Sequence, residues 1–180
     1  AFARVPSRVG EGRDGPLRAL EAALGALGAS AKDLDSIGVG CPGVIDPDTG
    51  ALRGETPHLP HWRDFSLRDE VSALFEVPVC ADNDANVGAL AEHALGAGRG
   101  ARTLVLVTLG TGIGCGIVLE GRVHRGAWGG AGEIGHVPLG DGSLACRCGV
   151  PGCVEPEASA SGLVRAAAAA GRTVANAEEV

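Results

Sequence analysis

Three cysteines and one histidine in the second half of this sequence have the residue types and spacing of metal ligands. Cys146, Cys148 and Cys153 form a C-x-C-x4-C run, and His136 precedes them. Three sulfur atoms and one imidazole nitrogen can close a tetrahedral shell around Zn2+ with no position left for water. The glycines and the proline between the last two cysteines allow the loop to fold back on itself. The pattern therefore predicts a structural zinc site.

Two carboxylates, Glu133 and Glu155, bracket these ligands in the sequence. Neither is needed by the metal if sulfur and imidazole fill its shell. Because ionised carboxylates are multiple hydrogen-bond acceptors, a pair of them fixed beside a metal-braced loop is typical of a site for hydroxyl groups.

The cysteine count also allows another interpretation. Six cysteines are an even number, which in a short secreted protein would suggest disulfides. This chain shows no secretory signal, so we favour zinc over disulfides for the clustered cysteines. Cys41, Cys80 and Cys115 stand alone in apolar segments, where we expect buried thiols that pack as small hydrophobic groups.

A second group of polar residues, the run DNDAN at residues 82–86, lies between a predicted strand at 77–81 and a predicted helix. Asp and Asn are common helix caps, so capping alone is one explanation. One cap needs one such residue, however, and ligands of α/β proteins bind at the carboxyl ends of strands, which favours a functional site. On the helix we expect Val87, Leu90, Ala91 and either Ala94 or Leu95 to face inward.

A glycine-rich turn separates two predicted buried strands in TLVLVTLGTGIGCGIVLEG. Gly110, Thr111, Gly112 and Gly114 would leave backbone N–H groups and a hydroxyl able to cradle phosphate oxygens without a lysine. A plain hairpin is the alternative. The turn joins two strands and opens no helix, so it is not the dinucleotide-binding fingerprint.

The remaining segments supply the elements that must position these groups. Pro16 and the leucine spacing predict a helix over 16–28, and residues 36–40 read as a short strand ending at a Pro-Gly turn. The proline-rich segment GETPHLPHWRDF has no helical or strand period and is expected to be a loop. Ser66 and Asp69 form a capping-box pattern before a helix, and the alanine-rich run 158–170 predicts another helix.

Composition excludes several functional classes. The net charge is −7 without a basic cluster, which argues against a nucleic-acid or membrane surface as the main partner. The single lysine, Lys32, is not part of a GK[ST] phosphate loop, and no GxSxG motif is present. No apolar run has the length of a membrane span, so we expect a cytoplasmic protein.

The chain contains five motifs in this order: GVGCPGVID, DNDAN, LGTGIGCG, GAGEIGH and CRCGVPGCVE. In these motifs and their order it resembles the ROK family of bacterial sugar kinases and sugar-responsive repressors. The resemblance covers roughly residues 37–159. The resemblance implies an α/β, actin-like (ribonuclease-H-like) sugar kinase fold with the sugar between two domains. Residues 1–81 would be the remainder of the small N-terminal domain, and residues 82–180 the large domain with the zinc loop, incomplete at its C-terminus. It also implies a homodimer.

The resemblance further assigns roles to individual residues. Asp84 matches the family's catalytic base and Asn83 its sugar-binding neighbour. Gly43 matches a glycine near the sugar. Glu133, His136 and Glu155 match residues that hold sugar hydroxyls, with His136 also a zinc ligand. The implied reaction is transfer of a phosphoryl group from ATP, bound with Mg2+, to the 6-hydroxyl of glucose or a close relative.

The turn Gly110, Thr111 and Gly112 matches the family's second phosphate motif. His58 stands where many family glucokinases have asparagine, at a position that faces the sugar. The family's first phosphate motif and its C-terminal nucleotide-base segment do not occur, so we expect this sequence to be truncated at both ends. The alternatives are a sugar-sensing repressor, which would need an upstream DNA-binding domain, and a non-catalytic zinc-binding fragment.

Overall fold

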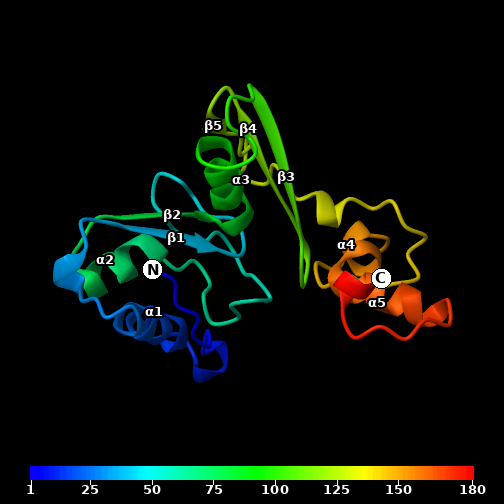
Figure 1. Cartoon of the computed structure of the whole chain (residues 1–180), viewed down its shortest axis with the longest axis horizontal. Helices are drawn as coiled ribbons and strands as arrows, with labels where there is room; N and C mark the ends of the chain where they lie inside the picture. The colour runs from blue at the N-terminus through cyan, green and yellow to red at the C-terminus, as the bar shows by residue number, and fades with distance from the viewer. The chain divides into compact units, whose positions relative to one another are not determined.

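The computed structural model of the protein describes all residues 1–180 and divides into two compact units, Ala1–Asp84 and Ala85–Val180 (Figure 1). We describe each unit by itself. The expected domain boundary lay near Ala81, and assignment of the units to the two domains of a sugar kinase stays a prediction.

The first unit is a small parallel strand pair covered by helices. Strand β1 runs parallel to β2, from the pair Ile37 and Val79 to the pair Cys41 and Asn83. Figure 1 shows two longer helices on one side of this pair. The elements are η1 (Val9–Glu11), α1 (Gly15–Ala26), η2 (Ala31–Asp33), β1 (Ile37–Cys41), α2 (Leu67–Phe75) and β2 (Val79–Asn83).

The loop between β1 and α2 supplies much of this unit's core. Trp62 and Phe65 stack with ring centroids 4.3 Å apart, and both are buried. The Trp62 indole N–H donates to the Arg13 carbonyl at 2.8 Å, which satisfies its polar atom. The segment has no regular secondary structure, as its sequence predicts, but it packs against α1 and α2 through large apolar side chains.

The second unit is built on an antiparallel sheet in the order β3-β4-β5. A short loop at residues 110–112 joins β3 to β4, and Leu109 pairs with Ile113 across it. The elements are α3 (Asp84–Ala94, beginning at the last residue of the first unit), β3 (Thr103–Leu109), β4 (Ile113–Leu119), β5 (Arg122–Val123), η3 (Ile134–His136), α4 (Val154–Ala158), α5 (Ala160–Ala169) and η4 (Ala177–Glu179).

Helix α3 packs on β4 through its small residues, because the strand carries glycines where the helix crosses it. A Cβ atom at Gly116 would lie 2.3 Å from the Ala85 carbonyl oxygen and 2.6 Å from the Ala89 Cβ. Ala85 and Ala89 are accordingly buried. The predicted inward face of this helix was wrong, since Val87 and Leu90 are 41% and 43% exposed.

Strand β3 also differs from the expectation of a buried strand. It is an edge of the sheet, and Val105, Val107 and Leu109 on it are exposed. Its other face is covered, because Leu106 approaches Gly88 of α3 and Leu104 approaches Gly98 in the turn after that helix. No helix of the structure has the length and apolar character that crossing a membrane requires.

Candidate functional site

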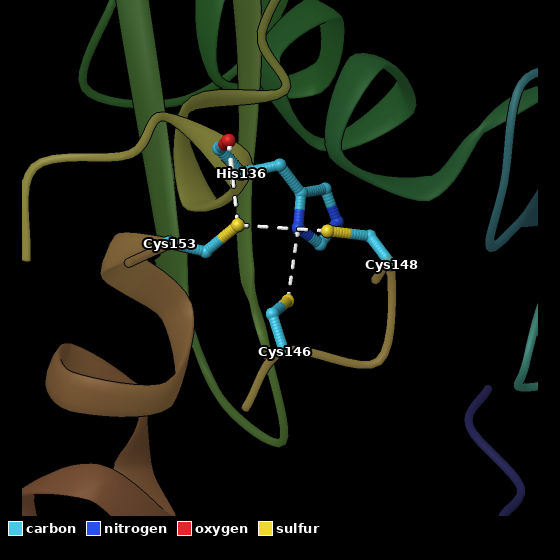
Figure 2. Close-up of side chains that lie close together, drawn as sticks. All are labelled: His136, Cys146, Cys148 and Cys153. Atoms are coloured by element: carbon cyan, nitrogen blue, oxygen red, sulfur yellow. Dashed lines mark hydrogen bonds between the residues drawn. The ribbon is translucent and has the colours of Figure 1, made fainter. Parts of the chain in front are cut away.

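His136, Cys146, Cys148 and Cys153 meet at one point of the second unit (Figure 2). Their ligand atoms all lie within 4.8 Å of one another. The Cys146 sulfur is 3.5 Å from His136 Nδ1, and the Cys148 and Cys153 sulfurs are 3.5 Å apart. Tetrahedral ligands at the usual Zn–N and Zn–S lengths would be about 3.5–3.8 Å apart, so the donor set fits Zn2+.

All cysteines are free thiols, and the cluster contains no disulfide. Cys146 and Cys153 are buried while Cys148 is exposed. Burial raises the pKa of the Cys153 thiol to about 12, with a further rise from Cys148 and Cys146, whereas the Val150 N–H lowers the pKa of Cys148. Cysteine binds metal as the thiolate, so loading this site would release protons.

The imidazole of His136 has different neighbours at its two nitrogens. Nδ1 faces the sulfur cluster, and Nε2 lies 3.8 Å from Glu133 Oε2. A metal-binding histidine commonly directs its second nitrogen to a carboxylate, which fixes the orientation of the ring. Glu133 is therefore placed beside the metal cluster without belonging to it.

Glu155 lies in the first turn of α4, next to the cluster in sequence but directed at the glycine turn. Its Oε2 accepts the Ile113 backbone N–H at 3.0 Å. This contact between residues 42 apart in the chain was not predicted from the sequence. The glycines at 112 and 135 were a signal that could have found it, because glycine often marks a place where other groups approach the backbone closely.

The glycine turn itself is compact and accessible. The Gly110 N–H donates to the Gly112 carbonyl at 3.0 Å, and Thr111 is exposed. Gly114 does not belong to the turn, contrary to the sequence-based prediction. It lies in β4, where an added Cβ would be 3.2 Å from the Ala85 Cβ, so it serves helix packing.

The carboxyl end of β2 groups the predicted residues of the first unit. The Asn83 Nδ2 donates to the Gly43 carbonyl at 3.1 Å, and Gly43 has φ = 103°. Asp84 begins α3 and is exposed. Burial, with a smaller contribution from the Asp84 charge, raises the pKa of the Cys41 thiol to about 12. Asp84 therefore lies near both the Pro-Gly turn and an unreactive buried thiol.

Two remaining predictions concern single residues. His58 is exposed on the loop between β1 and α2, and its backbone N–H donates to Thr56 Oγ1 at 3.5 Å. Cys80 is exposed, although we expected it to be buried like Cys41 and Cys115. It lies on the exposed face of the two-stranded pair, where Gly38 and Gly40 of β1 are exposed too.

Comparisons with known proteins identify the family of this chain. The ROK family profile matches residues 11–179, and this chain belongs to the ROK family. Its sugar kinases have the actin-like, ribonuclease-H-like two-domain fold, and this mixed α/β chain contains part of that fold.

Individual relatives include both kinases and repressors. A glucokinase of Halalkalibacterium halodurans is 45% identical over 152 residues, 83% of this chain and 45% of that protein. A putative xylose repressor of a Caldicellulosiruptor species is 39% identical over 145 residues, 81% of this chain and 36% of that protein. The chain thus spans less than half the length of these curated relatives.

Among solved structures, a ROK family glucokinase from Streptomyces griseus in complex with glucose and AMPPNP superposes with a TM-score of 0.76 at 35% identity. The match covers 86% of this chain and 48% of that one. Kinase relatives of known structure therefore share the architecture that the two units show.

Proposed function

We propose that this chain belongs to an ATP-dependent hexose kinase of the glucokinase type, acting on the 6-hydroxyl of glucose or a close relative. The observation that carries the proposal is the end of β2, where Asn83 is tied to the Gly43 carbonyl at 3.1 Å and Asp84 presents an exposed carboxylate. The similarity to glucokinases at up to 45% identity supports the same reaction class.

Asp84 is the general base of this proposal. A sugar hydroxyl becomes a better nucleophile when a carboxylate is placed to accept its proton as it attacks phosphorus. Asp84 directly follows β2 and is the first residue of α3, so its backbone is fixed by both elements. Phosphoryl transfer needs little more from the protein than this base, accurate positioning and charge neutralisation.

Glu133, His136 and Glu155 are proposed to hold the sugar hydroxyls. Glu133 lies against the imidazole of His136, whose ring the metal cluster fixes. Four protein ligands leave a zinc ion no open position, so its role would be structural. Gly43 and His58 are proposed to complete the hexose contacts in the first unit.

The turn Gly110, Thr111 and Gly112 is proposed to contact the phosphates of ATP. Backbone N–H groups and a hydroxyl at an exposed turn can bind phosphate oxygens without a lysine. Mg2+ bound to the nucleotide would neutralise the charge that develops during transfer. ATP supply agrees with the expected cytoplasmic location, and a homodimer is the assembly we expect.

A sugar-responsive repressor is the second candidate, because a putative xylose repressor is 39% identical to this chain. The two candidates differ in whether a phosphoryl group moves. Phosphorus NMR of the whole protein with ATP and a panel of hexoses and xylose tests this. We expect ADP and a hexose 6-phosphate. Sugar binding without any ADP formation would favour the repressor and reject the kinase.

A further inference from the structure

The turn between β3 and β4 is held by the segment that follows the metal cluster, at both of its ends. The Ile113 N–H donates to Glu155 Oε2 at 3.0 Å, and the Ala160 N–H donates to the Gly110 carbonyl at 3.0 Å. One contact is made by a side chain of α4 and the other by the backbone at the start of α5. The conformation of the turn thus depends on where these helices begin.

Two glycines, Gly112 and Gly135, lie close to the Glu155 side chain. A Cβ at Gly112 would lie 2.4 Å from Glu155 Oε2, and a Cβ at Gly135 would lie 3.3 Å from the Glu155 Cβ. Both distances are shorter than ordinary van der Waals contacts. The half-buried Glu155 side chain therefore lies against the turn through its carboxylate and against η3 through its Cβ.

The metal cluster adjoins the backbone that carries Glu155. Cys153 is the residue immediately before α4, and Glu155 follows two positions later. The Val154 N–H donates to the Val137 carbonyl at 3.1 Å, which joins the start of α4 to the residue after His136. The backbone that carries Glu155 is thus joined to two of the four metal-ligand positions: it follows Cys153 in the chain, and it is hydrogen-bonded to the residue after His136.

We propose that Glu155 is a positioning residue for the turn Gly110 to Gly112, and that through it metal loading sets the affinity of this turn for nucleotide phosphates. The inference rests on the proposed function in taking the turn as a phosphate site. A glycine turn has many accessible conformations, and fixing one of them before binding removes part of the ordering cost. A hydrogen bond to an ionised carboxylate is a strong way to fix it.

Unfolding measurements test the contact without metal or nucleotide. Gly112 does not have a positive φ, so alanine is compatible with its backbone, and the clash with Glu155 is the main cost. We expect Gly112→Ala to lower the melting temperature of the wild-type protein by several degrees and to change it little in a Glu155→Ala background. Equal losses in both backgrounds would overturn the proposed role of Glu155.

Calorimetric titration with AMPPNP tests the link to the metal. We expect chelation to weaken binding in the wild-type protein roughly five- to 30-fold, the change in an equilibrium that one or two kcal/mol produces. In Glu155→Ala, affinity should be low with or without metal, and Glu155→Gln, which keeps an acceptor oxygen, should recover most of it. Glu157→Gln on the same helix is the matched control and should respond to chelation like the wild type.

The outcomes separate the inference from the proposed function. Wild-type affinity in Glu155→Ala, or the same response to chelation in that variant, would overturn the inference while leaving ATP binding intact. A wild-type protein that binds no AMPPNP in either metal state would reject the phosphate role of the turn, and with it the ATP part of the proposed function. The melting temperatures of Gly112→Ala in the wild-type and Glu155→Ala backgrounds would still decide whether Glu155 holds the turn.

Discussion

Substitution of Gly43 by alanine should strongly destabilise the first unit, because the position combines backbone strain with a steric clash. Gly43 has φ = 103°, a region that L-residues with a side chain rarely adopt. An added Cβ would lie 2.8 Å from Leu52 Cδ1 and 3.3 Å from the Thr56 Cβ. Leu52 is 1% exposed and cannot move aside without disturbing the core.

The expected loss follows from these two terms. Strain at such a backbone position costs about 1–3 kcal/mol, and overpacking a buried site costs about 1–3 kcal/mol more. The sum of about 2–6 kcal/mol is a large part of the about 5–15 kcal/mol that stabilises a typical domain. With a urea m-value of about 1–3 kcal/mol/M, the midpoint should fall by about 0.7 M or more.

The fluorescence of Trp62 reports on this unit. Trp62 is 4% exposed, and the other tryptophan, Trp128, is 83% exposed. In a Trp128→Phe background, urea unfolding followed by Trp62 emission gives the midpoint. Gly38→Ala is the control, since nothing lies within 4 Å of its Cβ. Equal midpoints for Gly43→Ala and Gly38→Ala would refute the reasoning.

Three further predictions follow from other parts of the chain. Elemental analysis should find one zinc per chain. Chelation or Cys146→Ser should lower the melting temperature, whereas Cys80→Ser, outside the cluster, should not. A metal-free protein of unchanged stability would reject the metal site. Arg53 and backbone N–H groups lower the pKa of Asp46 from its usual value of 3.8 to about 2. The ionised carboxylate therefore stabilises the protein above pH 3.8, and this contribution is lost as the pH falls through 2. Asp46→Asn should therefore reduce stability at neutral pH and flatten its decline between pH 4 and 2 in urea titrations, and an unchanged acid profile would contradict this. Gly116→Ala should cost about 1–3 kcal/mol of unfolding free energy, because its Cβ would meet the backbone of α3, and a neutral effect in the same assay would show that the helix can move away.

The elements that the sequence predicted well are those with local signals. The helix after Ser66 begins where the capping pattern placed it, with the Ser66 hydroxyl accepting the Asp69 N–H. The spacing of the three cysteines is local too, and the structure brings them together with His136. In these places nearby residues determine the conformation, so the pattern carries the information.

The contacts that sequence analysis missed are non-local. Hydrophobicity placed Val87 and Leu90 inward on α3, but the partner surface is the glycine-containing strand β4, which accepts only small residues such as Ala85 and Ala89. The glycines in this strand were a sign of close backbone approach that outweighs side-chain hydrophobicity.

Glu155 shows the same limit at the candidate site. The sequence predicted a sugar ligand beside the metal loop, and this role stays a prediction, but it did not predict that the Glu155 carboxylate also binds the backbone of Ile113. A hydrogen bond between residues 42 apart in the chain has no signature in local composition.

The most direct test of the central proposal is the turnover of Asp84→Asn in the whole protein with ATP and glucose. We predict a fall in kcat of about 100- to 10,000-fold, the usual contribution of a general base, with glucose affinity changed only a few-fold. Asp48→Asn, which removes another exposed carboxylate of the same unit, is the control and should retain wild-type turnover. Turnover of Asp84→Asn within tenfold of the wild type would contradict the account.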